Sequence, residues 1–189
     1  MAAPTSDRAA ATPRVVTIGV YEFDLPSFLA ALRAHDVGLL VDVRQRRGGR
    51  GARYAWANAR RLQEALAEQG IAYSHHRELA PTTELRQLQY AADARNRVGK
   101  RSRAVLDPEY VAGYVREILD QADLEALVAE LPADAASALL CVEADPEACH
   151  RSLIATRLRD RYGLPVEHVR PAQRAPATSS SRSPSGSRR

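Results

Sequence analysis

The stretch Val15-Val16-Thr17-Ile18-Gly19-Val20 decides the fold class, because it is a short run of mostly β-branched residues that passes into a glycine. Such a run is typical of a strand buried on both faces, whereas a half-exposed strand alternates apolar and polar residues. Four further runs of this kind follow along the chain, separated by segments with helical spacing. The expected strands are 15–20, 39–43, 71–75, 137–142 and 166–169.

Helical patterns fill the intervals between these expected strands. Pro26 suits the first turn of a helix over 25–36, and Asn58 can cap a helix over about 59–69. Further helices are expected at 82–98, from 107 onward, at 123–130 and from 145 to about 162. In the last of these Asp145 is the expected cap and Pro146 the first helical residue, so Cys149 should lie near the positive end of the helix.

Strands that alternate with helices predict an α/β fold with a parallel sheet covered on both faces. We expect a single doubly wound, Rossmann-like domain over residues 15–170, with a roughly five-stranded sheet in the order 3-2-1-4-5. Residues 1–14 are expected to form a disordered lead. Residues 171–189, which are rich in Ser, Arg and Pro, are expected to form a disordered tail.

Charge and composition exclude several classes of function. The formal net charge of +4 equals the four arginines of residues 171–189, where no acidic residue occurs. The rest of the chain is balanced and is therefore not a globally basic nucleic-acid binder. No apolar run approaches the roughly 18 residues that span a membrane, and no secretory signal is apparent. Two cysteines make no disulfide framework of a secreted domain, so we expect a cytoplasmic protein.

Polar residues interrupt the apolar runs where the expected strands end. In an open α/β sheet, ligands bind beyond the carboxyl ends of the strands, here between the first and fourth. Gly19, Asp42, His75 and Glu143 leave the ends of four strands, and Arg44 follows the second. Asp42 either orients a ligand or pairs with Arg44. Glu143 either acts as a general acid or base or satisfies backbone groups of a turn.

The segment from Cys141 to Arg151 gathers the most reactive side chains. A helix N-terminus and a neighbouring Arg151 or protonated His150 would lower the pKa of the Cys149 thiol. The alternative is that both cysteines are small buried apolar residues, which we favour for Cys141. Zinc ligation is disfavoured because seven residues separate the cysteines and Cys149 adjoins His150. We assign no metal and no cofactor.

Two stretches are rich in arginine. Residues 44–53 contain five arginines, among them Arg44 and Arg47, and three glycines, which suits phosphate binding by arginine forks and backbone amides. Residues 95–103 contain five basic residues, and there we expect a solvated loop. No Walker loop or dinucleotide fingerprint is present.

The order and spacing of these motifs resemble the family called domain of unknown function 488, or YeaO-like, over about residues 15–170. The resemblance implies a single α/β domain in which the matching positions form one shared site. Many members carry Thr-Ile-Gly-His-Ser at the first strand, whereas this chain has Val20 and Tyr21 after Gly19. The matching residues are Thr17-Ile18-Gly19, Val41-Asp42-Val43-Arg44, Tyr73, His75, Cys141, Glu143 and Cys149-His150-Arg151-Ser152.

Three functions are compatible with the sequence. The leading hypothesis is binding of a nucleotide or nucleic-acid phosphate at the carboxyl edge of the sheet, by a hydrolase or transferase. The partner would be a phosphate-containing small molecule or a nucleic acid. Phosphate would be held by Gly19, Arg44, Arg47, His75 and Arg151, and acid–base groups would come from Asp42, Glu143 and His150. The alternatives are a thiol enzyme or redox sensor that uses Cys149, and a non-enzymatic nucleic-acid adaptor that uses the basic tail and loop.

Overall fold

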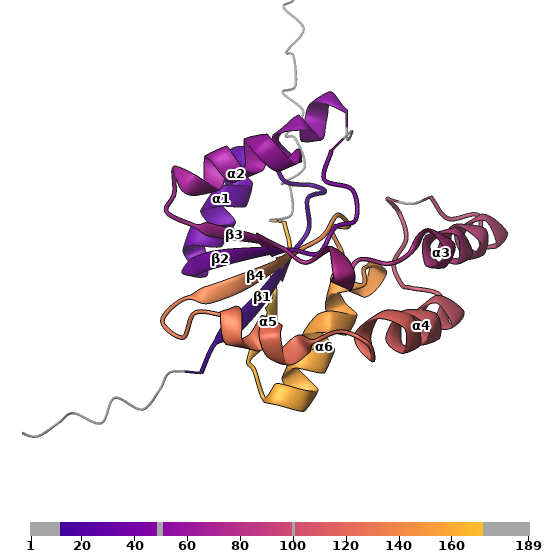
Figure 1. Ribbon diagram of the computed structural model, residues 1–189. Coiled ribbons are helices and arrows are strands. Elements are labelled where there is room, and N and C mark those ends of the chain that lie inside the picture. Colours follow the sequence, from indigo (N-terminus) through magenta and orange to yellow (C-terminus); the bar gives the residue numbers. More distant parts are fainter. Residues whose placement is uncertain (1–11, 49–50, 100, 172–189) are drawn as a thin grey trace, which may run out of the picture.

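The protein has a Rossmann-like α/β fold with one five-stranded parallel sheet (Figure 1). The computed structural model describes residues 12–48, 51–99 and 101–171. The expected lead and tail therefore lie almost entirely outside the described residues. The strands are β1 (Arg14–Ile18), β2 (Val37–Asp42), β3 (Ala72–His75), β4 (Ala136–Leu140) and β5 (Val166–His168).

Helices cover both faces of the sheet. Figure 1 shows α1 and α2 on one face and α5 and α6 on the other. Helices α3 and α4 pack side by side beyond the carboxyl ends of the strands. No helix within the described ranges is long and apolar enough to cross a membrane. The helices are α1 (Leu25–Ala34), α2 (Ala59–Ala67), α3 (Thr83–Arg95), α4 (Pro108–Tyr114), α5 (Leu124–Glu130) and α6 (Arg151–Tyr162).

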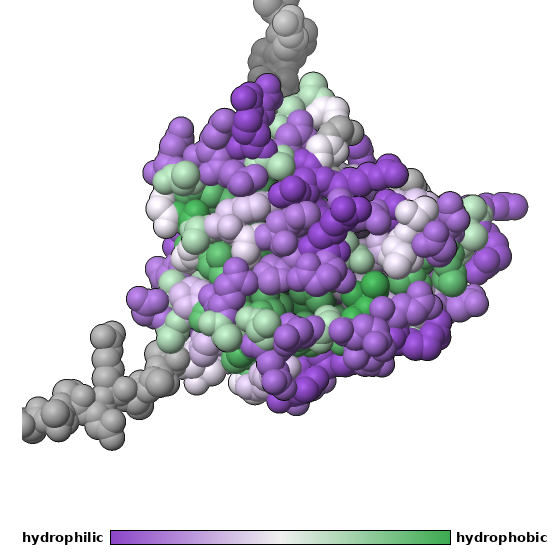
Figure 2. Space-filling model, in the orientation of Figure 1, coloured by the Kyte–Doolittle hydropathy of each residue, from purple (hydrophilic) through white to green (hydrophobic). Residues whose placement is uncertain are grey.

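The three inner strands β1, β2 and β4 are largely apolar because each contributes to two hydrophobic layers. Successive side chains of a strand point to opposite faces, so Leu139 packs with α5 and α6 while Leu140 packs with α1 and α2. Both leucines are fully buried. Burial of each such side chain contributes about 1.5–3 kcal/mol to stability. Hydrophilic residues cover most of the surface in Figure 2, and apolar atoms emerge near α4 and α5.

The predicted strand order is wrong for two strands: it exchanges β1 and β4. The order is β3-β2-β4-β1-β5, so β4 lies between β2 and β1. Helix α1 carries the chain from β1 past one strand position to β2, and β4 fills the space that is left. All five residues of β4 are buried, as a central strand requires. Helix α2, which follows β2, and helix α6, which follows β4, pack on opposite faces of the sheet. In open α/β sheets a ligand-binding crevice forms at such a point, here beyond the carboxyl ends of β2 and β4.

The predicted start of the last helix is also wrong. Pro146–Ala148 form a single 3-10 turn, and Cys149 is extended, with φ −140° and ψ 140°. Helix α6 begins only at Arg151. Asp145 does not cap the helix but forms an ion pair with Arg170 at 2.6 Å. An Asp-Pro-Glu sequence favours a 3-10 turn as well as an α-helix, and Cys149 therefore precedes the helix.

Candidate functional site

A pocket of about 230 Å³ lies at the carboxyl edge of the sheet. Its walls come from the segments after β1, β2 and β4, from α3 and the start of α4, and from the turn before α6. The volume lies below the range of about 300–1,000 Å³ that is typical of sites for drug-sized ligands. The lining residues are Tyr21, Arg44, Gln45, Arg46, Pro81, Arg86, Gln89, Tyr90, Arg103, Leu106, Tyr110, Cys141, Val142, Glu143, Ala148, Cys149 and His150.

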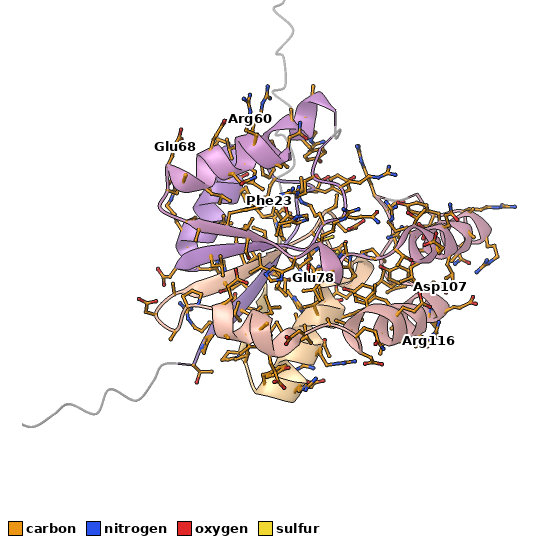
Figure 3. All side chains as sticks on the ribbon, in the orientation of Figure 1. Phe23, Arg60, Glu68, Glu78, Asp107 and Arg116 are labelled. Atoms are coloured by element: carbon orange, nitrogen blue, oxygen red, sulfur yellow. The ribbon has the colours of Figure 1, made fainter. Side chains whose placement is uncertain are left out.

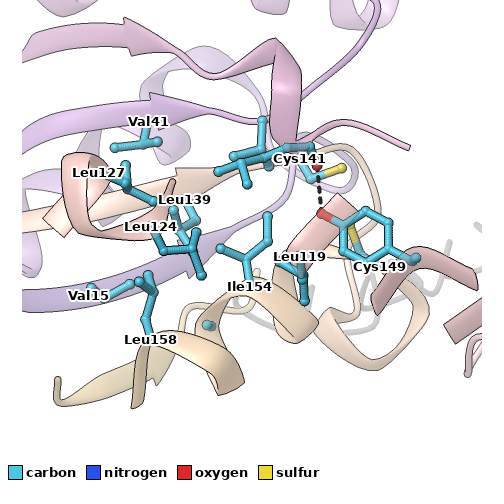
Figure 4. Close-up of a cluster of buried hydrophobic side chains, with 14 of the residues drawn as sticks. Val15, Val41, Leu119, Leu124, Leu127, Leu139, Cys141, Cys149, Ile154 and Leu158 are labelled. Carbon is cyan, nitrogen blue, oxygen red and sulfur yellow. Dashed lines mark hydrogen bonds between the residues drawn. The ribbon is translucent and has the colours of Figure 1, made fainter. Parts of the chain in front are cut away.

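Four reactive side chains line this pocket close together, and we call Cys141, Glu143, Cys149 and His150 the thiol cluster. Cys141 Sγ lies 3.7 Å from both Glu143 Oε2 and His150 Nδ1. Cys149 Sγ lies 3.9 Å from the same Nδ1. Both cysteines are free and buried, and Figure 4 shows their sulfurs at one end of the hydrophobic layer. The sequence predicted Glu143, Cys149 and His150 as site residues, whereas for Cys141 it favoured a purely structural role. No comparison tests what these residues do.

The imidazole of His150 has one fixed orientation. Its Nε2 lies 3.1 Å from Val43 O, so Nε2 carries the proton that this carbonyl accepts. Nδ1 is then left to face the two sulfurs. The ring also packs on Tyr114, with the ring centroids 5.4 Å apart, and the hydroxyl of Tyr114 donates to Leu79 O at 2.6 Å. When His150 is neutral, Nδ1 is therefore the ring nitrogen without a proton. Burial opposes protonation of this ring, but the charge of Cys149 and its hydrogen bond outweigh burial and raise the pKa of His150 above its ordinary value.

The cluster groups shift one another's pKa. Burial raises the pKa of Glu143 to about 7 and raises the pKa of the Cys141 thiol well above its ordinary value. Burial also opposes ionisation of Cys149. The hydrogen bond from Cys141 and the positive charges of Arg151 and His150 outweigh that effect, so the pKa of Cys149 falls well below its ordinary value. The cluster thus combines a neutral thiol with a thiol that ionises readily.

Asp42 and Arg44 form a buried ion pair beside the cluster. Arg44 donates from Nε and Nη2 to the two carboxylate oxygens, at 2.8 and 2.7 Å, and from Nη1 to Ala57 O. Tyr73 OH donates to Asp42 at 2.7 Å, and Arg47 donates to that hydroxyl at 3.1 Å. Arg47 does not line the pocket. This network holds the end of β2 against β3, and it occupies two of the three arginines that were expected to bind phosphate.

Arg151 and Gly19 build the turn that carries Glu143. Arg151 is fully buried and donates to Glu143 O at 2.6 Å and to Ala144 O at 2.9 Å. A Cβ on Gly19 would lie 1.9 Å from Glu143 O, so only glycine allows β1 to approach this turn so closely. Both residues therefore support the cluster from behind, and neither lines the pocket.

His75 ends β3 and His76 follows it, and neither lines the pocket. His75 Nε2 is 3.0 Å from Arg44 O, so His75 contacts the site only through the backbone that follows β2. His76 forms ion pairs with Glu78 and Glu130 when it is protonated.

Helices α3 and α4 supply a wall of the pocket that the sequence did not reveal. Arg86, Gln89 and Tyr90 come from α3, and Arg103 follows it. Arg103 is buried against Asp93 and lies 4.0 Å from Glu143 Oε1, so for this residue the expected solvated loop is wrong. The signal that could have found it is an acid on the polar face of α3, ten residues before the arginine.

Comparisons with known proteins place the chain in a family. No curated protein and no solved structure gives a match. Among protein families, the match is to the domain of unknown function DUF488 over residues 24–158. This range runs from α1 into α6 and includes Asp42, Arg44, His75 and the whole thiol cluster, but not Gly19 or β5. Because the match covers well over half of the sequence, the chain belongs to the family DUF488.

Proposed function

We propose that this protein is an enzyme that binds a small phosphate-bearing substrate in the pocket and catalyses hydrolysis or group transfer at the thiol cluster. The observation that carries the proposal is the pocket itself. Two thiols, an imidazole and a carboxylate line it together, at the edge where open α/β sheets bind ligands. Structural proteins rarely bury so many ionisable groups side by side, because each must be desolvated.

The charges of the lining favour an anionic substrate. Four arginines and one carboxylate line the pocket. Arg44 and Arg103 are matched by Asp42 and Asp93, which are not part of the lining. Arg86 lines the pocket and donates to Thr82 O and Thr83 Oγ1 at the start of its own helix rather than to a carboxylate. We therefore assign Arg86 the phosphate-binding role that the sequence gave to Arg44, Arg47 and Arg151.

The walls and volume of the pocket narrow the substrate class. A pocket of about 230 Å³ suits a sugar phosphate or a single nucleotide unit and is too small for a dinucleotide. Tyr21, Tyr90 and Tyr110 supply aromatic surface on which a base or sugar ring can stack. We therefore expect a small phosphate ester rather than a long polymer that lies across the surface.

Ligand binding at low salt tests the phosphate-binding proposal. Equilibrium dialysis with a panel of mononucleotides and sugar phosphates should find a ligand whose Kd rises about tenfold in Arg86→Ala, because one charge-assisted hydrogen bond is lost. Arg60→Ala is the matched control, since Arg60 is exposed on α2 away from the pocket (Figure 3). The proposal fails if no compound of the panel binds, or if both variants bind as the parent does.

Thiol chemistry at Cys149 is the second candidate function. The observation that favours it is that Cys149 and Cys141 are both free and flank His150 in the pocket wall. Alkylation with iodoacetamide, followed by peptide mass spectrometry, should then modify Cys149 faster than Cys141. Equal or undetectable modification of the folded protein contradicts a nucleophilic Cys149.

The adaptor hypothesis depends on the basic tail, which lies almost wholly outside the described residues. Removal of residues 172–189 tests it, because an adaptor that uses the tail would lose nucleic-acid binding. An enzyme that uses the pocket would retain its small ligand.

A further inference from the structure

We propose that Cys141 Sγ, Cys149 Sγ and His150 Nδ1 bind one zinc ion, with the remaining coordination position open to the pocket. The three ligand atoms lie within 4.8 Å of one another. All three residues are buried and line the pocket. Metal binding stands independently of the proposed function, whereas a catalytic role for the ion rests on it.

The distances match a tetrahedral zinc site. Zinc binds cysteine sulfur at about 2.3 Å and histidine nitrogen at about 2.0–2.1 Å, so the sulfur and nitrogen of one site lie about 3.6 Å apart. Cys141 Sγ and Cys149 Sγ lie 3.7 and 3.9 Å from His150 Nδ1. The two sulfur–nitrogen distances are therefore close to those of a zinc site before any ion binds.

The histidine is oriented as a metal ligand. Its Nε2–H donates to Val43 O, which leaves Nδ1 as the ring nitrogen free to bind a metal. Nδ1 lies 3.9 Å from Cys149 Sγ and 3.7 Å from Cys141 Sγ, which is 3.9 Å from Nε2 as well, so a small turn of the ring or of Cys141 brings all three ligand atoms onto one ion. Ligand histidines commonly donate their second ring N–H to a carbonyl or carboxylate in this way, which fixes the tautomer and makes the other nitrogen a better ligand. The stacking on Tyr114 holds the ring in this orientation.

The backbone explains how two adjacent residues can both be ligands. Cys149 is extended and His150 already has helical dihedrals, with φ −60° and ψ −19°. The bend between them turns both side chains toward Cys141 at the end of β4. The two cysteines can therefore meet although seven residues separate them. The sequence argued against zinc because a zinc knuckle has a shorter spacing.

The open position distinguishes a reactive site from a purely structural one. Structural zinc sites are closed by four protein ligands, whereas catalytic sites have three and keep a position for water or substrate. Glu143 is the neighbouring candidate for a fourth ligand, with Oε2 3.7 Å from Cys141 Sγ. Its side chain also borders the pocket and lies 4.0 Å from Arg103, which competes for the carboxylate. We therefore place Glu143 beside the open position rather than on the ion.

Metal content and a cobalt spectrum test the site. The full chain is purified without a histidine tag, and its metal content is measured by elemental mass spectrometry. We expect close to one zinc ion per chain. After chelation, added Co²⁺ should give the thiolate-to-cobalt charge-transfer absorption in the near ultraviolet. Cys149→Ser and His150→Ala should each weaken zinc binding by at least about tenfold in competition with a chromogenic chelator.

Two control variants separate ligation from folding. Glu143→Gln should retain the metal and the cobalt spectrum, and so should His35→Ala, which removes a histidine far from the pocket. If a cysteine variant does not fold, the cobalt spectrum of the parent still decides. Absence of both zinc and the charge-transfer absorption overturns the proposal, as does unchanged zinc affinity in Cys149→Ser. The two proposals can fail separately. If metal-free protein still binds the phosphate-bearing ligand, and Arg86→Ala weakens that binding, the proposed function stands even when no zinc is bound.

Discussion

Removal of the charge of Asp42 should destabilise the protein strongly. Asp42 and Arg44 are 0% and 1% exposed, and Arg44 donates to Asp42 from Nε, from Nη2 and from its backbone N–H at 2.7–3.0 Å. Asp42→Asn therefore leaves the guanidinium as a buried charge without its counter-ion. Removal of one partner of such a pair costs about 3–5 kcal/mol, which is a large share of the roughly 5–15 kcal/mol by which a domain is stable.

Urea unfolding followed by circular dichroism measures this loss. With a slope of about 2 kcal/mol per molar urea, the midpoint should fall by roughly 2 M. The exposed pair of Arg14 and Asp36, 3.8 Å apart, gives the matched control: Asp36→Asn should cost less than about 1 kcal/mol.

A double variant tests whether the buried charge is the cause. Asp42→Leu combined with Arg44→Met removes both charges, so its loss of stability should be clearly smaller than the sum of the two single losses. A loss below about 1 kcal/mol in Asp42→Asn, or strict additivity in the double variant, refutes the argument that this pair supports the end of β2. Direct roles of Asp42 and Arg44 in substrate binding would then regain support.

Three further outcomes follow from single contacts. Gly19→Ala should cost about 3 kcal/mol or more in urea unfolding, because its Cβ meets Glu143 O. A Cβ on Gly48 makes only an ordinary contact with Asn58 at 3.9 Å, so Gly48→Ala should be close to neutral. Asp107→Ala removes the cap of α4 and should cost about 1 kcal/mol, and a loss below the error of the measurement would contradict a capping role. Burial, aided by nearby arginine charge, lowers the pKa of His168, so protonation favours the unfolded chain. Stability should therefore fall as pH drops below about 6.5, and fall less steeply in His168→Gln; equal slopes would exclude this contribution.

The fold could be predicted from the sequence because the inner strands β1, β2 and β4 are short, largely apolar runs and the intervals between strands have helical patterns. The strand order could not, because runs such as those of β1 and β4 are equally apolar, and which of them is central depends on crossover lengths. The start of α6 was missed for a local reason. An Asp cap followed by proline starts a 3-10 turn as readily as an α-helix, and only the backbone of Cys149 shows which one forms.

The candidate site was predictable where reactive side chains follow strand ends. The residues of the thiol cluster are close in sequence to the end of β4, so topology alone brings them together. The wall formed by Arg86 and Arg103 was not predictable, because α3 reaches the pocket through a long connection between β3 and β4. Arginine roles were equally hidden, since a phosphate-binding arginine and a buried, paired one have the same sequence signature. Arg44 pairs with Asp42 and Arg151 donates to carbonyls of another segment, whereas Arg86 donates within its own helix and lines the pocket.

The buried position of Arg151 explains how the thiol cluster keeps its geometry. Cys141 and Glu143 are fixed by β4 and the turn after it, whereas Cys149 and His150 are fixed by the start of α6. Arg151 joins these two units, because it begins α6 and donates to the carbonyls of Glu143 and Ala144. Gly19 brings β1 against the same turn from the other side. Backbone contacts outside the pocket thus set the distances between the sulfurs and the imidazole. The reactive side chains therefore keep their positions even when a ligand takes up their hydrogen-bonding groups.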